Sequence, residues 1–167
     1  DDAVVIVTTQ MNRVLEVDPV ERIAWVEPGV LNLDLSRSVA HLGLHYAPDP
    51  SSQQACTIGG NVGTNAGGPH CLASGVTSAD VLAVDAVLGD GSVARLGGTA
   101  PDVPGYDLRG CFVGSEGTMG IAGRVAVRVV ARARRELEQH RRLAALGVEV
   151  ELLPAHARAR RVAPRQR

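Results

Sequence analysis

The stretch that decides the fold is "TIGGNVGTNAGGP", which runs from Thr57 to Pro69 and holds five glycines and two asparagines. Glycine loses more backbone entropy on ordering than any other residue, so an ordered segment of this composition needs a reason. Unshielded backbone N–H groups can bind an anion such as a pyrophosphate. Alternatively, the glycines let a neighbouring helix or strand pack closely. Spacing alone leaves both interpretations open.

The polar side chains of this stretch suit a nucleotide. Asn61 and Asn65 offer amides, and Thr57 and Thr64 offer hydroxyl groups. The spacing matches neither the G-x-G-x-x-G fingerprint nor the P-loop pattern. A second glycine-rich segment, "GSEGTMGI" at 114–121, is by itself typical of a tight turn. Two such segments on either side of one predicted hairpin favour an extended ligand that contacts both.

The remaining pattern predicts an α+β domain. The expected elements are strands over 3–9, 13–18, 22–27 and 45–47, a helix over 31–42, a hairpin over 80–97, a helix over 106–112 and a strand over 121–130. Gly89 and Gly91 are expected to supply positive φ at the second hairpin's turn, and Asp107 is a candidate helix cap. Residues 48–75 form a long loop, or a loop with a short helix, which is usually functional. Because the strands fall mostly in hairpins, the pattern argues against a Rossmann sheet.

Composition excludes several function classes. Hydrophobic residues make up 45% and aromatic residues 2% of the chain, so the core must be aliphatic. The chain has no lysine, which excludes a Walker lysine or a Schiff base on this chain. No apolar run reaches eighteen residues, and the first residues do not resemble a signal peptide, so neither a membrane span nor secretion is expected. Three cysteines without C-x-x-C spacing predict reduced thiols and a cytoplasmic location.

Charge divides the chain near Ala131. Residues 1–130 carry seven arginines and fourteen acidic residues, whereas residues 131–167 carry ten arginines and four glutamates. We therefore expect one domain over 1–130 and a divergent arginine-rich helix and tail over 131–167. A helix over 132–147, a strand over 148–153 and an unstructured end are predicted. Because glutamates are interspersed and the body is acidic, a solvated helix is favoured over a nucleic-acid site.

The motifs "MNRVLEVD", "PGV", "APDPSS", "IGGNVGTNAGG", "GYDL" and "GSEGTMGI" occur in this order over about residues 4–130. They resemble the flavin domain of the group formed by the flavin-binding chain of glycolate oxidase, D-lactate dehydrogenase and D-2-hydroxyglutarate dehydrogenase. This group has an FAD-binding fold of the vanillyl-alcohol-oxidase (PCMH) type, and the chain looks like its second subdomain. The resemblance implies an FAD that lies extended between two subdomains.

The resemblance also implies where FAD is contacted. Pro48, Asp49 and the run Thr57, Ile58, Gly59, Gly60 and Asn61 would line the flavin and pyrophosphate side; Thr64, Asn65 and Ala66 would approach the isoalloxazine; Gly120 and Ile121 would lie near the adenine end. The redox step would move a hydride from C2 of a D-2-hydroxy acid, such as glycolate or D-lactate, to the flavin. An electron acceptor and partner subunits are expected for the intact parent.

The sequence departs from this family pattern in three places. It begins just after the expected P-x-G-x-G-T loop, it is too short for the C-terminal cap domain, and its arginine-rich end does not match. We therefore expect an FAD-binding domain that is incomplete at both ends, and no catalytic residue is assigned. The alternatives are a non-catalytic remnant with weak or no FAD binding, and a nucleotide-binding module unrelated to flavin.

Two histidine patterns have ordinary explanations. His41 and His45 have a spacing that can bind a metal on one helix face, but Gly43 interrupts the helix and no third ligand is evident, so no metal site is expected. His70 and Cys71 are adjacent; an ordinary loop pair is favoured over a nucleophilic pair or a covalent flavin link.

Overall fold

The computed structural model describes residues 5–100 and 104–132. The chain divides into two units, Asp1–Ala131 and Arg132–Arg167. Beyond Arg132, the predicted helix, strand and tail of the second unit lie outside the described residues. The interpretation of residues 131–167 as a divergent helix and tail therefore stays a prediction, and the description below concerns the first unit.

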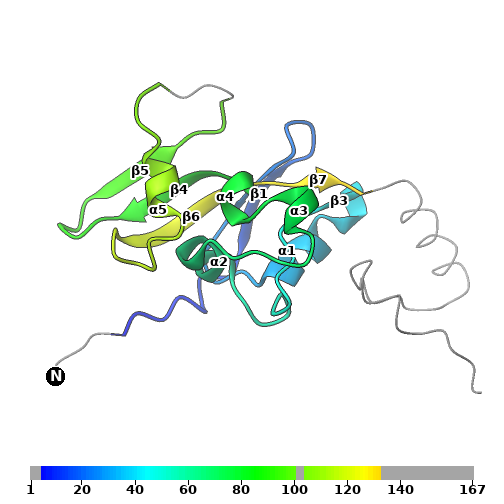
Figure 1. The fold of residues 1–167 in the computed structure, drawn as a ribbon, viewed down its shortest axis with the longest axis horizontal. Coiled ribbons are helices and arrows are strands. Elements are labelled where there is room, and N and C mark those ends of the chain that lie inside the picture. Colours follow the sequence, from blue (N-terminus) through cyan, green and yellow to red (C-terminus); the bar gives the residue numbers. More distant parts are fainter. Residues whose placement is uncertain (1–4, 101–103, 133–167) are drawn as a thin grey trace, which may run out of the picture. The chain divides into compact units, whose positions relative to one another are not determined.

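A five-stranded antiparallel sheet forms the centre of this unit (Figure 1). Its strands lie in the order β1 (Val14–Asp18), β2 (Ile23–Val26), β6 (Ile121–Arg128), β4 (Val81–Val87) and β5 (Val93–Gly97). Each neighbouring pair is antiparallel. A separate two-stranded ladder joins β3 (Leu44–His45) to β7 (Val130–Ala131). This arrangement confirms the predicted hairpins and the α+β class.

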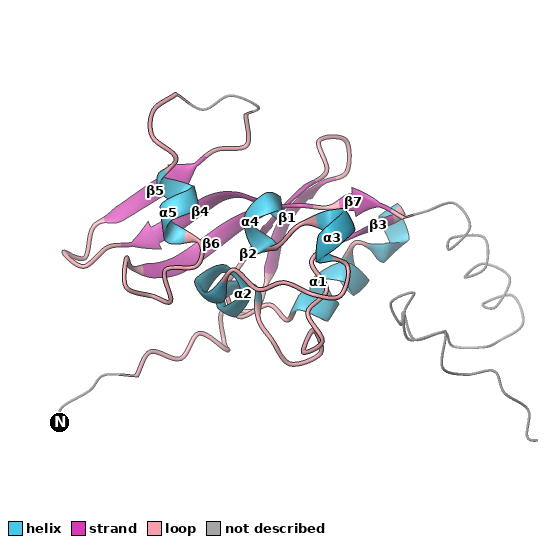
Figure 2. Ribbon diagram, in the orientation of Figure 1, coloured by secondary structure: helices cyan, strands magenta, loops and turns pink. Residues whose placement is uncertain are grey.

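Short helices accompany the sheet, and Figure 2 shows α4 and α5 in front of the strands. They are α1 (Asn32–Ser38), the 3-10 helix η1 (Ala40–Leu42), α2 (Ile58–Thr64), α3 (Cys71–Ser74), α4 (Thr77–Asp80) and α5 (Leu108–Phe112). The core that helices and strands share is almost entirely aliphatic, as the composition predicts; it includes Val26, Leu35, Ile58, Val62, Val84, Val125 and Val127.

Local sequence signals explain where several helices start and stop. The expected helix over 31–42 is present as α1 followed by η1, and Gly43 ends it with a left-handed φ of 73°. Asp107 caps α5 as predicted, because its Oδ1 accepts a hydrogen bond from the Gly110 N–H at 2.9 Å. The cap satisfies one of the backbone donors that the first turn of a helix leaves unpaired.

Two local predictions are wrong. Residues 5–9 form no strand, although Val5, Ile6 and Val7 are β-branched; these side chains are 83%, 60% and 69% exposed. No strand pairs with them within the described residues, and strand propensity needs a paired, half-buried surface to take effect. Of the two glycines at the second hairpin's turn, Gly91 has a positive φ, 82°, and Gly89 does not; Asp90 Oδ1 accepts hydrogen bonds from the Ser92 N–H and hydroxyl in this turn.

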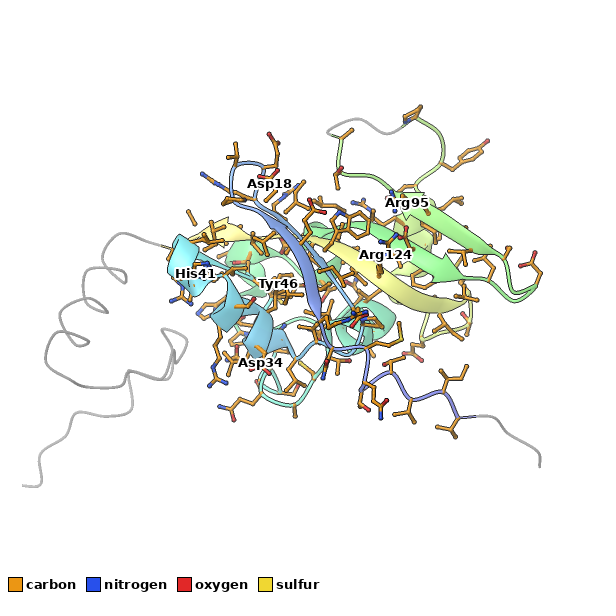
Figure 3. All side chains as sticks on the ribbon, turned by 180° about the vertical axis from the view of Figure 1, so that it is seen from behind. Asp18, Asp34, His41, Tyr46, Arg95 and Arg124 are labelled. Carbon is orange, nitrogen blue, oxygen red and sulfur yellow. The ribbon has the colours of Figure 1, made fainter. Side chains whose placement is uncertain are left out.

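The sheet face opposite the core carries a charged cluster around Trp25. The guanidinium carbons of Arg95 and Arg124 lie 5.0 and 5.6 Å from the centre of the Trp25 ring. Figure 3 shows both arginines from behind. The carboxylate of Asp85 accepts hydrogen bonds from both, at 2.7 Å from Arg95 Nε and 2.8 Å from Arg124 Nε. The Arg95 hydrogen bond is the main cause that holds the pKa of Asp85 below its ordinary value.

Candidate functional site

The glycine-rich stretch folds into a short helix, α2, because both ends are capped. The Thr57 hydroxyl accepts a hydrogen bond from the Gly60 N–H at 3.1 Å, and Thr57 itself has extended dihedral angles. Asn65 ends the helix in the left-handed region, with a φ of 48°. Ile58 and Val62 are fully buried and anchor α2 to the core. The expectation of a loop with a short helix is therefore confirmed.

Three of the five glycines are explained by close internal packing. A β-carbon on Gly59 would lie 2.7 Å from the Pro28 side chain, and one on Gly67 would lie 2.6 Å from the Cys71 sulfur. A β-carbon on Gly68 would overlap the Asp49 carbonyl oxygen. Each of these distances is shorter than non-bonded atoms tolerate, so close packing is enough to explain why glycine occupies these three positions.

The other two glycines lie on the more open side of α2. Gly60 is exposed, and a β-carbon there would meet nothing nearer than the Thr57 hydroxyl at 3.3 Å. A β-carbon on Gly63 would have no neighbour within 4 Å. Gly60, Gly63 and Thr64 have the spacing of neighbours on one helix face. This face, which we call the bare face of α2, is open to a ligand.

The backbone donors at the start of α2 are already used. The Ile58 N–H donates to the Val30 carbonyl at 2.8 Å, and the Gly59 N–H donates to the Pro28 carbonyl at 2.7 Å. The Gly60 N–H is taken by the Thr57 cap. The interpretation of this turn as a cradle of free N–H groups is therefore not supported by the geometry.

One polar group of the stretch has no partner. The side chain of Asn61 is buried, with the residue 1% exposed, and its Nδ2 atom makes no hydrogen bond within the described residues. A buried amide without an acceptor costs about 1–3 kcal/mol. Asn65, in contrast, accepts from the Ser78 N–H through Oδ1 at 2.9 Å, which fixes the end of α2 against α4.

The second glycine-rich segment packs against the end of α2. The Gly114 N–H donates to the Val62 carbonyl, and the Glu116 N–H donates to the Gly63 carbonyl, each at 2.8 Å. A β-carbon on Gly114 would lie 3.2 Å from that of Asn65. The two segments, which the sequence predicted to share one ligand, are therefore neighbours in space. The Glu116 side chain is exposed, and its backbone joins the segments.

The other predicted contacts fall into two places. The Pro48 carbonyl accepts from the buried Asn32 side chain at 2.9 Å, and Asp49 contacts the loop that follows α2. Ala66 accepts from the Thr77 hydroxyl at 2.7 Å. Gly120 and Ile121 lie apart from these, at the start of β6, where Ile121 pairs with Val87 of β4.

Sequence reasoning missed a buried polar group behind the site. Asp80 is 5% exposed and Tyr46 is 2% exposed, and Asp80 Oδ2 has no hydrogen-bond partner within the described residues. Burial raises the pKa of Asp80 to about 6, although Arg128 lowers it in part. Burial and then the Asp80 charge raise the pKa of Tyr46. The sequence feature that could have predicted this buried carboxyl group is the position of Asp80, directly before an apolar strand.

The described residues hold no group of three or more His, Cys, Asp or Glu side chains arranged for a metal ion. His41 lies in η1 and His45 in β3, so the two do not share a helix face. No helix in 5–100 or 104–132 is long and apolar enough to cross a membrane.

A groove of about 640 Å³ lies beside β5 and α5, lined in part by Tyr106, Arg109 and Arg128; it includes none of the predicted FAD contacts.

Comparison with known proteins identifies the family. Residues 1–97 match the family described as FAD binding domain. The chain is 46% identical over 132 residues to glycolate oxidase subunit GlcD of Escherichia coli K12, covering 79% of this chain and 26% of that protein. It is 39% identical over 128 residues to D-lactate dehydrogenase of Anaerostipes hadrus, covering 76% and 27% respectively.

The fold of the chain is also similar to that of a solved protein structure. An alkyldihydroxyacetonephosphate synthase superposes on the chain with a TM-score of 0.65 and 26% sequence identity, over 75% of this chain and 22% of that one. The chain belongs to the FAD binding domain family, and it spans about a quarter of the length of the relatives it matches. The predicted family and the predicted cofactor, FAD, are confirmed.

Replacing Gly63 with alanine is expected to stabilise the FAD-free chain by about 1 kcal/mol. Alanine favours a helix interior over glycine by about that amount, and no atom lies within 4 Å of the new methyl group. Urea unfolding measures the change. Gly59→Ala is the matched comparison on the same helix; since its methyl group would meet Pro28, it must destabilise. Equal effects of the two changes would contradict the packing described above.

Proposed function

We propose that this chain is the FAD-binding portion of a flavin-dependent oxidoreductase that acts on a D-2-hydroxy acid such as glycolate or D-lactate. The family match supports the cofactor, and the similarity to a glycolate oxidase subunit and to a D-lactate dehydrogenase supports the substrate class. In this proposal an electron acceptor and possible partner subunits belong to the intact protein.

The observation that carries the proposal is the bare face of α2 beside the Gly114–Gly117 turn. A flat ring system can approach a helix face that has no side chain beyond Thr64. Asn61 follows Gly60 in α2, and its buried amide has no partner within the described residues; a flavin or ribityl oxygen that reached it on binding would provide the acceptor. The residues present therefore fit FAD, although through this face and side chains rather than through the first-turn N–H groups.

The residues of α2 that were predicted to contact FAD remain in the proposal, but only some of them would contact the cofactor directly. Gly60, Asn61 and Thr64 would hold the cofactor directly, whereas Ile58 and Gly59 support α2 from the core side. Bound FAD would supply the hydride acceptor. The chain's own part is to orient the cofactor and to exclude water from it along α2. No acid or base for the substrate hydroxyl is assigned to the described residues.

Flavin binding tests the proposal directly. The purified chain is titrated with FAD, and quenching of flavin fluorescence and the visible absorption bands are recorded. Binding that Asn61→Ala weakens about ten-fold would support the proposed contact, since a hydrogen bond contributes about 1 kcal/mol and a buried amide more. Asn12, an exposed residue before β1, provides an Asn→Ala control outside α2. Unchanged binding by Asn61→Ala would contradict the assignment.

A second candidate is a non-catalytic chain that binds FAD weakly or not at all. The consumed N–H donors at Ile58, Gly59 and Gly60 favour it, because they leave the phosphates without backbone partners there. Failure to quench FAD fluorescence would decide for this candidate. The cytoplasmic location expected from the reduced thiols also stays a proposal.

A further inference from the structure

The shortest side-chain hydrogen bond around the site lies outside α2. His70 Nδ1 is 2.5 Å from Asp49 Oδ2. Asp49 is well buried, with 12% of its side chain exposed, and His70 is 38% exposed. Because a carboxylate only accepts hydrogen bonds, Nδ1 carries the proton and donates it, which fixes the orientation of the imidazole ring. We call this pair the Asp49–His70 clasp.

The clasp joins the two ends of one long segment. Asp49 and His70 are 21 residues apart, and the segment between them contains α2 and its bare face. Because Ile58 and Val62 already anchor α2 to the core, the clasp restricts the parts of the segment on either side of α2, and without it these parts would have more conformational freedom. Rigidity gained before binding lowers the entropy that a ligand must remove.

Both ends of the clasp are anchored independently. On one side, the carbonyl of Pro48 accepts from the buried Asn32 side chain at 2.9 Å. On the other side, the Cys71 N–H donates to the Gly68 carbonyl at 3.1 Å, and the Gly68 N–H donates to the Cys71 sulfur at 2.8 Å. The clasp therefore links two locally fixed turns and does not tether loose chain.

The backbone at the clasp is shaped to permit it. Gly68 lies directly on Asp49, and a β-carbon there would overlap the Asp49 carbonyl and lie 2.8 Å from Oδ1. The missing side chain lets the loop approach closely enough for the imidazole to reach the carboxylate. His70 also starts α3, since its carbonyl accepts from the Ala73 and Ser74 N–H groups at 2.9 Å.

We propose that the Asp49–His70 clasp positions the bare face of α2 for the flavin, which makes His70 a positioning residue for FAD binding. The inference rests on the proposed function, because it assumes that this face receives the cofactor. Asp49 would then act through His70, whereas the family resemblance implies that Asp49 itself lines the flavin and pyrophosphate side.

Two matched substitutions at one position test the clasp. In His70→Asn the side-chain nitrogen occupies the place of Nδ1 and keeps the bond to Asp49, whereas in His70→Gln the nitrogen corresponds to the other ring position and loses it. We expect FAD affinity to fall about ten-fold in His70→Gln and in Asp49→Ala, which removes the acceptor, and to stay within about three-fold of the unmodified chain in His70→Asn. His41→Gln, a change of an exposed histidine in η1, is the control.

Amide hydrogen exchange of the FAD-free chain gives the second measurement. Exchange over residues 48–71 is expected to accelerate in His70→Gln but not in His70→Asn, while the amides of β4 and β6 remain protected. If His70→Gln binds FAD as tightly as the unmodified chain, or if His70→Asn is equally weak, the inference is overturned. If the unmodified chain binds no FAD, the proposed function and the flavin role fall together, and the exchange result still decides whether the clasp closes the segment.

Discussion

Replacing Gly120 with alanine is expected to lower the free energy of unfolding by about 4 kcal/mol, because two penalties coincide. Gly120 has a φ of 145°, which side-chain-bearing residues rarely adopt. A β-carbon there would also lie 2.5 Å from the Val87 carbonyl oxygen. That oxygen belongs to the central ladder of β4 and β6, so the clash cannot be relieved by turning a surface side chain. Urea unfolding of the FAD-free chain measures the effect.

Substitutions at two other glycines distinguish the cost of an unfavourable φ from the cost of the clash with Val87. Gly117 has a φ of 81° but no atom within 4 Å of a β-carbon, so Gly117→Ala should lose only the conformational part, about 1–2 kcal/mol. Gly89 has neither a positive φ nor a near neighbour, so Gly89→Ala should change stability by less than about 0.5 kcal/mol. A Gly120 variant no weaker than the Gly117 variant would show that the Val87 contact costs nothing.

The sequence predicted the strands well where apolar segments and turn residues agree. The hairpin of β1 and β2 follows from alternating residues around a short turn, and that of β4 and β5 follows from two apolar segments joined at Gly89-Asp90-Gly91. Where one signal stood alone, it failed. Val5, Ile6 and Val7 have high strand propensity, yet pairing is a property of two segments and propensity reports one.

At the candidate site, the sequence predicted that two glycine-rich segments would contact one ligand, and α2 and the Gly114–Gly117 turn are neighbours in the fold. That these segments contact FAD stays a prediction. The sequence could not show which glycines serve internal packing and which leave space for a ligand, because both uses require a residue without a side chain. Only the positions of Pro28, Cys71 and Asp49 show that Gly59, Gly67 and Gly68 are needed for packing. The Asp49–His70 bond was equally hidden, since it joins residues 21 positions apart.

Replacing Asp80 with asparagine is expected to stabilise the chain at pH 8 and to have little effect near pH 4. Burial raises the pKa of Asp80 from 3.8 to about 6, so the folded chain holds this proton more tightly than the unfolded chain does. The carboxyl therefore favours folding most at low pH. Its contribution is lost as the pH rises from about 4 through 6. The loss is about 1.4 kcal/mol for every ten-fold change in proton affinity, or about 3 kcal/mol in all.

Asparagine carries no charge at any pH, so the variant escapes this loss. Its amide replaces a neutral carboxyl group of similar size that is equally short of partners, so the cost of burial is similar near pH 4 and the net gain at pH 8 is about 3 kcal/mol. The measurement is urea unfolding of both chains at a series of pH values from 4 to 8. A difference between the two chains that stays constant across this range would show that Asp80 titrates normally in the fold.

Asp85 provides the matched comparison. It lies in β4, the strand that begins directly after Asp80, and its pKa is lowered where that of Asp80 is raised. Hydrogen bonds from Arg95, and to a lesser degree from Arg124, lower the pKa of Asp85, so its carboxylate stabilises the fold above its unfolded pKa. Asp85→Asn should therefore cost about 2 kcal/mol at pH 8, and less as the pH falls, by breaking charge-assisted bonds and leaving two arginines beside Trp25 without their shared anion. The two asparagine variants should thus shift stability in opposite directions at the same pH. That result would separate the effect of burying a carboxylate from the effect of pairing one.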